Sequence, residues 1–163
     1  MPPMAQKRSR ELRPLSSEHH QALLVAFQLK KGLSGHSETA GAPKDLPGLL
    51  ALARRFEDSI FLAHTRAEEE LLGQHLSKTD MKRLQFEHAE MVRLLEAARS
   101  ARPNEMRQAL TSFADLLERH IRWEERELFP GCESDMDEAA LATVGHELEK
   151  RHVTRAEKTP KRA

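Results

Sequence analysis

Apolar side chains recur at every third or fourth position along most of this chain, and that spacing limits the possible folds more than any other feature. Because an α-helix turns once in ~3.6 residues, the spacing gathers the apolar side chains on one face of each helix. Alternation of apolar and polar residues, which is typical of strands, is nearly absent. Leu, Ala, Glu, Arg, Gln and Met fill these segments, and they are good helix formers. The sequence therefore predicts an all-α protein.

Glycine and proline divide the helical pattern into separate segments. They cluster at 32–48, around Pro103, and at Pro130 and Gly131, and such residues usually mark the ends of helices. Helices are predicted over residues 16–31, 47–76, 80–99, 104–129 and 135–152. Four long amphipathic helices with short connections favour an antiparallel up-down four-helix bundle, with the fifth as an additional C-terminal helix. A chain of 163 residues suits one such domain.

The charges are balanced in number but not in position. The chain has 26 basic and 26 acidic residues, yet its first fourteen residues hold four basic side chains and one acidic one. Its last fourteen hold six and one. We therefore expect a basic, solvated N-terminal arm over 1–14, the bundle over 15–132, and a C-terminal helix with a basic tail over 133–163. Because no aromatic residues are interleaved with the basic ones, we expect no specific nucleic-acid partner.

The remaining composition indicates a cytoplasmic protein. A single cysteine, Cys132, excludes an internal disulfide and suits a reducing compartment. The first residues are charged and lack the apolar segment of a signal peptide. No apolar run approaches the ~18–20 residues that a membrane-spanning helix needs, so we expect no membrane partner. Because no exposed apolar stripe is evident, the sequence is compatible with a monomer or a homodimer.

Histidines stand in the middle of the apolar stripe on three predicted helices. These are His64, His88 and His120. Two of them are followed one turn later by a carboxylate, Glu68 and Glu124, at the i,i+4 spacing that brings two side chains together. The segments "HTRAEEELLG" and "HIRWEERELFPG" are partial copies of each other. The chain therefore repeats one histidine–carboxylate pair on two different helices.

The first predicted helix offers two adjacent histidines. His19 is centred among apolar residues, whereas His20 is flanked by polar residues as well, so His19 is preferred and both remain possible. By the same reasoning from a helical wheel, Glu69 and Glu125 turn away from the stripe and should be solvated. Glu127 returns to the stripe, where it would be able to support a ligand.

This set of side chains predicts a site for two metal ions. One histidine on an apolar stripe is usually an ordinary core residue with a hydrogen-bonded partner, but here four imidazoles and two carboxylates would be buried together. Burying unpaired carboxylates costs more than a fold of ~5–15 kcal/mol tolerates unless cations balance them. Imidazole with carboxylate indicates a first-row transition metal. Six ligands exceed one tetrahedral zinc but suit two ions bridged by the carboxylates.

At these residues the sequence resembles the haemerythrin-like (HHE cation-binding) family. The resemblance covers roughly residues 15–130 and is carried by "LSSEHHQAL", "HTRAEEELL", "FEHAEM" and "HIRWEERELFP". It implies a four-helix bundle that holds a non-haem diiron site with two carboxylate-bridged iron ions. The implied ligands are His19 (or His20), His64, Glu68, His88, His120 and Glu124.

The chain departs from the oxygen-carrying haemerythrins at two positions. Those proteins have a second histidine one turn along the third helix, where this chain has Val92, and an aspartate where it has Glu124. With one imidazole fewer, one iron is expected to keep an open position. The expected function is therefore to bind or sense O2, NO or peroxide, or to handle iron. The alternatives are a diiron peroxidase or NO-handling enzyme, and a metal-free helical interaction module.

Overall fold

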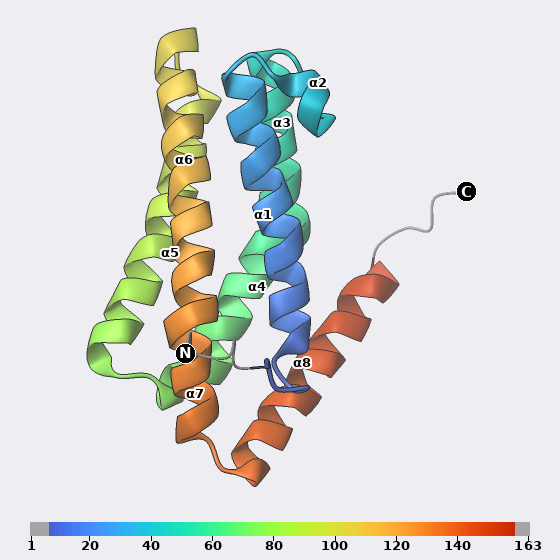
Figure 1. The fold of residues 1–163 in the computed structure, drawn as a ribbon, viewed down its shortest axis with the longest axis vertical. Coiled ribbons are helices and arrows are strands. Elements are labelled where there is room, and N and C mark those ends of the chain that lie inside the picture. Colours follow the sequence, from blue (N-terminus) through green and yellow to red (C-terminus); the bar gives the residue numbers. More distant parts are fainter. Residues whose placement is uncertain (1–6, 159–163) are drawn as a thin grey trace, which may run out of the picture.

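Four long helical segments run alongside one another, alternately up and down, and a further helix crosses their lower end (Figure 1). The structure is a computed structural model that describes residues 7–158; residues 1–6 and 159–163 lie outside it. Within the described range every regular element is helical. The predicted all-α up-down bundle is confirmed.

The elements follow the predicted order with shifted ends. The first segment is α1 (Arg13–Leu33), and the short α2 (Ser37–Ala40) lies in the connection that follows it. The second segment consists of α3 (Leu46–Phe56), the π-helical turn η1 (Glu57–Phe61), α4 (Leu62–Ala67), the π-helical turn η2 (Glu68–Leu72) and the 3-10 turn η3 (Gly73–His75). The third is α5 (Lys78–Arg99). The fourth consists of α6 (Pro103–Trp123), the π-helical turn η4 (Glu124–Leu128) and α7 (Phe129–Asp135), and α8 (Glu138–Lys158) is the additional C-terminal helix.

Pro130 and Gly131 do not end the fourth segment, contrary to the expectation from the sequence. The segment continues to Asp135 because the proline falls in the first turn of α7, where a missing N–H is tolerated. In the widened turn just before it, the N–H of Phe129 donates to the carbonyl of Glu124, five residues back. If the same five-residue spacing continued, the donor to the carbonyl of Glu125 would be residue 130. Because residue 130 is a proline and has no N–H, this carbonyl receives no backbone hydrogen bond from it.

The buried apolar residues form two clusters, one above and one below a polar layer. The upper cluster includes Phe56, Phe61, Leu95, Phe113 and Leu117. The lower cluster includes Leu12, Leu72, Leu84, Trp123 and Phe129, and α8 covers it through Val144 and Leu148. The four central histidines of the sequence pattern lie where the two clusters meet, each between an upper and a lower apolar residue of its own helix. The core therefore holds its polar side chains in one layer.

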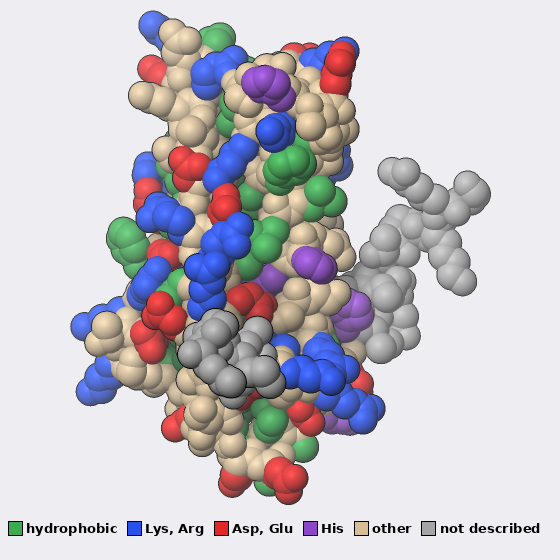
Figure 2. All heavy atoms as spheres, viewed as in Figure 1, with side chains coloured by type: hydrophobic (Ala, Val, Ile, Leu, Met, Phe, Trp, Pro, Cys, Tyr) green, Lys and Arg blue, Asp and Glu red, His purple; other side chains and the backbone are tan. Residues whose placement is uncertain are grey.

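The C-terminal helix also touches the residues that precede α1. Gly145 of α8 lies so close to Glu11 that an added Cβ would be 3.2 Å from the Cα of Glu11. Leu12 is fully buried and Arg8 is largely buried, whereas Lys7, Arg10 and Arg13 are exposed, so the described part of the N-terminal arm is only partly solvated. On the exterior, acidic and basic side chains are mixed over the face shown in Figure 2. No helix within residues 7–158 has the length and hydropathy that crossing a membrane requires.

Candidate metal centre

Six side chains converge in the polar layer and form two groups that share two members. The first group is His19, His64, Glu68 and Glu124, and the second is Glu68, His88, His120 and Glu124. In each group, one nitrogen or oxygen atom per residue lies within 4.8 Å of the others. We call the His19–His64 end the first half-site and the His88–His120 end the second half-site. His20 is exposed and belongs to neither.

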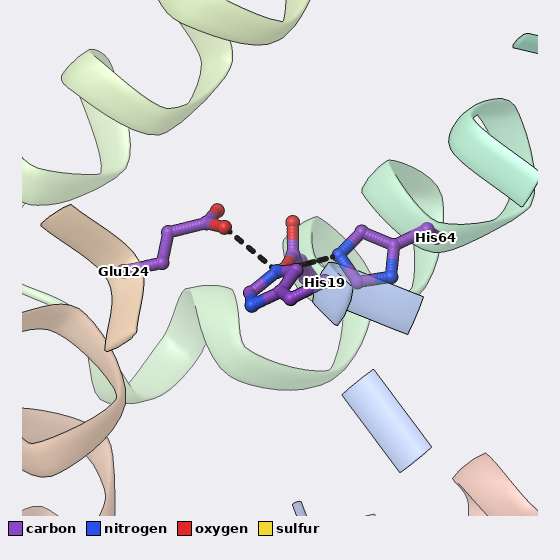
Figure 3. Close-up of side chains that lie close together, drawn as sticks. His19, His64 and Glu124 are labelled. Atoms are coloured by element: carbon purple, nitrogen blue, oxygen red, sulfur yellow. Dashed lines mark hydrogen bonds and ion pairs between the residues drawn. The ribbon is translucent and has the colours of Figure 1, made fainter. Parts of the chain in front are cut away.

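The histidines of each half-site bring their Nε2 atoms together. The two Nε2 atoms are 3.0 Å apart in the first half-site and 3.1 Å apart in the second. Figure 3 shows His19 between Glu124 and His64, contacting each of them. The two histidines of a half-site come from different helical segments, α1 with α4 and α5 with α6, so each half-site exists only in the assembled bundle.

Glu68 places one oxygen in each half-site. Its Oε1 is 2.8 Å from Nε2 of His64, and its Oε2 is 3.2 Å from Nε2 of His88. Glu124 does the same from the opposite side: its Oε2 is 2.9 Å from Nε2 of His19, and its Oε1 is 2.8 Å from Nε2 of His120. Each half-site thus has two imidazole nitrogens and two carboxylate oxygens directed into it.

The oxygens of the two central carboxylates have histidine nitrogens beside them but no well-aligned hydrogen bond. Glu68 and Glu124 are both completely buried, and none of their four oxygens accepts a well-aligned hydrogen bond from the described residues. A buried carboxylate without such donors is strongly destabilising unless a cation neutralises it. Mixed nitrogen and oxygen donors suit first-row transition metals. The residues present therefore fit a pair of metal cations.

Without a metal, the charges of this layer are shared between histidines and glutamates. Burial alone would lower the pKa of His88, but its contacts with Glu124 and Glu68 outweigh burial and raise that pKa to about 10. For His120, burial is likewise outweighed by Glu124, and the pKa rises to about 9. Burial raises the pKa of Glu68, but the neighbouring histidines overcome it and hold the pKa well below the ordinary value. Protons on the histidines thus take the place of metal charge.

A second set of glutamates holds the outer nitrogens of the same histidines. Glu125 lies 2.7 Å from Nδ1 of His19, and Glu69 lies 2.7 Å from Nδ1 of His88. Glu18 and Glu87 approach Nδ1 of His64 and of His120 at 3.4 Å, which is longer than a typical N–H···O hydrogen bond. A carboxylate on Nδ1 favours the tautomer with its proton there, which leaves Nε2 free to bind a metal.

Helical-wheel reasoning missed this outer set, and the sequence does contain a signal for it. Glu69 and Glu125 were expected to be solvated, but both contact a central histidine. In a four-helix bundle a side chain about 100° off the inward stripe faces a neighbouring helix, so it is not solvent-facing. The repeated pairs Glu-His and Glu-Glu, which place Glu18, Glu87, Glu69 and Glu125 next to central residues, would have identified the set.

One further expectation, for Glu127, is corrected by side-chain direction, and the direction of Val92 is also informative. Glu127 is exposed and does not support a ligand, because the π-helical turn η4 rotates the residues after Glu124 less than an α-helix would. Val92 is 38 % exposed. The position where oxygen-carrying haemerythrins have a further histidine therefore points away from the central layer in this chain.

A small cavity lies beside the first half-site. It has a volume of about 10 Å³, close to the least that holds one water molecule. His19, His64, His120 and Glu124 contribute to its lining. Its apolar walls are Ala22, Phe56, Ile60, Phe61, Leu117 and Ile121. Without movement of these walls, the cavity holds at most one molecule of about the size of water.

The bundle and its buried histidine and glutamate side chains define a class of protein, helical bundles with a candidate site for metal cations. The Hemerythrin HHE cation binding domain model matches residues 12–132 and, in a second overlapping match, residues 79–157. Because the first match covers most of the chain, the protein belongs to this family. No match was found among curated proteins or solved structures.

Proposed function

We propose that this protein binds two iron ions and uses them to bind or sense O2, NO or peroxide. The observation that carries the proposal is the position of the two buried carboxylates, each with one oxygen in either half-site. This is the arrangement that bridging ligands adopt between two ions ~3.5–4 Å apart. His19, His64, His88 and His120 would be the terminal ligands, with Glu68 and Glu124 as the bridges.

The chain's own residues would orient the ligands and restrict access. Glu125 and Glu69 keep Nδ1 of His19 and His88 as the hydrogen-bonded edge, so that Nε2 of these two imidazoles would face the metal. The apolar walls of the small cavity limit water beside the first half-site. Bound iron would supply electrons and a coordination position for a small molecule. Iron storage would not require such a cavity, so its presence favours small-molecule binding.

The alternative with a specific observation behind it is an enzyme that acts on peroxide or NO at the same site. The small cavity lies directly beside His19, His64 and Glu124, so peroxide or NO that widened it would reach the first half-site. The chain contains no tyrosine, which excludes a tyrosyl radical as an intermediate electron carrier. Steady-state assays with peroxide and with NO distinguish the two functions. Sustained turnover identifies an enzyme, whereas saturable spectral changes without turnover identify a binding or sensing protein.

The single tryptophan allows a direct test of iron binding. The ring of Trp123 is 5.9 Å from the ring of His120, centroid to centroid, so iron in the second half-site would lie close enough to quench its fluorescence. We expect anaerobic titration with ferrous iron to quench the emission until about two equivalents are bound. The melting temperature should rise in parallel, because a ligand that binds only the folded state stabilises it.

Two histidine variants make the titration specific. His64→Ala should weaken both the quenching and the thermal shift, although His64 lies on a different helix from Trp123, because the half-sites share their carboxylates. His20→Ala should leave both unchanged, since His20 is exposed. Emission that stays constant through two equivalents of iron, with no thermal shift, would contradict the diiron proposal and favour a metal-free interaction module.

A further inference from the structure

The two half-sites are related by an internal repeat of the chain. His19 corresponds to His88, and the glutamates on their Nδ1 atoms, Glu125 and Glu69, correspond to each other. The two Nδ1–carboxylate distances are equal at 2.7 Å. The side chains of Glu125 and Glu69 are also similarly exposed, at 30 % and 32 %. By these contacts alone, the two metal positions would be equivalent.

The surroundings of the two outer glutamates break this equivalence. Glu125 accepts a hydrogen bond from the hydroxyl of Ser16 at 2.7 Å and pairs with Arg8 at 3.0 Å. Among the side chains described in residues 7–152, Glu69 contacts neither a hydroxyl nor an arginine, and its recorded partner is His88. The residue that corresponds to Ser16, three positions before His88, is Gln85, whose side chain is exposed. Only one of the two equivalent glutamates is therefore fixed from outside.

Arg8 fixes Glu125 by its backbone as well as by its side chain. Its Nη2 donates to the carbonyl oxygen of Glu125 at 2.7 Å, the carbonyl that receives no backbone N–H from Pro130. Its Nη1 donates to Glu133, and the N–H of Ser9 donates to the same carboxylate at 3.2 Å. The guanidinium thus bridges η4 and α7. Its side chain is only 13 % exposed, so the interaction is well protected from solvent.

Arg8 also contacts Phe129, the aromatic ring that stacks on the face of His19. Its Cζ lies 5.2 Å from the ring centroid of Phe129, on the aromatic face that attracts cations. Phe129 in turn stacks on His19 with the ring centroids 5.1 Å apart and the planes 12° apart. Arg8 therefore contacts both groups that orient the His19 imidazole, Glu125 at its edge and Phe129 at its face.

We propose that Arg8 is a positioning residue that makes the two metal positions inequivalent, by holding His19 in its metal-binding orientation through Glu125 and Phe129. The inference rests on the proposed diiron function. It predicts that Arg8 slows the release of the ion in the first half-site. The contacts that both half-sites share would not by themselves produce this difference. It also assigns a role in the site to the N-terminal arm.

The test uses the full-length protein loaded with two cobalt(II) ions, whose paramagnetism shifts the Nδ1–H protons of bound histidines out of the crowded part of the proton NMR spectrum. Wild-type protein should show four such exchangeable signals. In Arg8→Ala, we expect one of them, that of His19, to exchange faster with solvent. A chelator should remove one ion roughly tenfold faster than from wild type, the lower end of the effect of partners outside the ligands. Release of the other ion should be unchanged.

Three variants separate positioning from general destabilisation, and a fourth serves to assign the NMR signals. Glu133→Gln removes a support of Arg8 without touching His19 or Glu125, and it should produce the same selective change in a weaker form. Arg83 pairs with Glu87, which faces His120, so Arg83→Ala should alter a different NMR signal. Arg10 is exposed, and Arg10→Ala should behave as wild type. His19→Ala assigns the His19 signal by its absence.

The outcomes distinguish this inference from the function on which it rests. Wild-type protein that binds no cobalt and no iron contradicts the diiron proposal. Wild-type protein that binds two ions, with an Arg8→Ala variant that releases both at unchanged rates, contradicts the role of Arg8 alone. Equal acceleration for both ions also contradicts it, because a loosened bundle would affect both half-sites alike.

Discussion

At the scale of single residues, the two glutamates that follow Glu124 have opposite environments. Glu125 contacts His19, Ser16 and Arg8, and these contacts outweigh burial and lower its pKa to about 2. Glu127 is exposed. An ideal helical wheel predicts the reverse, with Glu125 solvated and Glu127 facing the core. These two residues therefore show where helical periodicity alone gives the wrong environment.

Replacing Glu125 should weaken the site, whereas replacing Glu127 should not. Glu125→Ala removes the acceptor for Nδ1 of His19, and loss of such a partner typically costs 10–100-fold in metal affinity, so we expect a decrease of about that size for one ion. Glu127→Ala is the matched control, one charge removed from the same turn. Iron affinities from competition with a chelator decide the matter, and equal affinities for the two variants would show that the His19–Glu125 contact is unimportant.

The convergence of six side chains could be predicted from the sequence because all of them lie on inward-facing stripes. His64 with Glu68 and His120 with Glu124 need only a regular helix to be brought together. The choice between His19 and His20 needed the actual rotation of α1, which places His20 outside. Arg8 could not be predicted, because its contacts with Glu125 and Glu133 join residues more than a hundred positions apart through an irregular segment.

At the scale of the elements, periodicity predicted the helices but not their irregular turns. Two of the three π-helical turns begin at Glu68 and Glu124, and such turns are frequent at functional sites. Composition carries no clear signal for them. The same limit explains why the fourth segment was expected to end at Pro130: the widened turn that accommodates the proline is a property of the folded site.

Two helical glycines should respond oppositely to alanine. At Gly131 of α7 an added Cβ meets no atom within 4 Å, so Gly131→Ala should stabilise the fold by roughly 0.5–1 kcal/mol through helix propensity. At Gly145 of α8 the methyl group would collide with the backbone and side chain of Glu11, so Gly145→Ala should destabilise the protein by ~1–3 kcal/mol.

Urea unfolding of the two glycine variants measures both effects against wild type. Gly145→Ala should in addition loosen the segment that contains Arg8, because Glu11 is three residues from it. A Gly145→Ala variant as stable as Gly131→Ala would mean that α8 does not pack against the N-terminal arm as described.

At the scale of the whole molecule, the central layer makes the stability of the metal-free protein depend on pH. Burial alone lowers the pKa values of His88 and His120, but Glu124 and the other neighbouring carboxylates raise them to about 10 and about 9, against an ordinary value of 6.5. The folded state thus holds these protons more tightly than the unfolded state. The contribution of these protonated histidines to the free energy of unfolding is fully present below pH 6.5 and is lost as the pH rises to about 10.

The glutamates set the acid limit. The pKa values of Glu68 and Glu124 lie below the ordinary 4.5 in the folded state. The contribution of these two carboxylates to folding stability is therefore present above pH 4.5 and is lost on further acidification. The metal-free protein should therefore melt at its highest temperature between these limits and at a falling temperature from pH 7 to 10. Iron affinity should change in the opposite sense, because metal binding requires deprotonated imidazoles. Circular dichroism melts in a chelating buffer test the first trend, and a melting temperature that rises from pH 7 to 9 would contradict it.

The four outer glutamates also have a consequence for how the helices assemble. Glu18 of α1 faces a histidine of the second segment, and Glu69 of that segment faces one of α5. Glu87 of α5 faces one of α6, and Glu125 beyond α6 faces one of α1, which closes the circuit. If one helix slid along its neighbours by a single turn, its own histidine would leave the central layer. The histidine of the next helix would also lose the carboxylate that faces its Nδ1. Leucine and alanine stripes tolerate several alignments of such similar helices. The four glutamate–histidine contacts are all formed in only one alignment, so they select it.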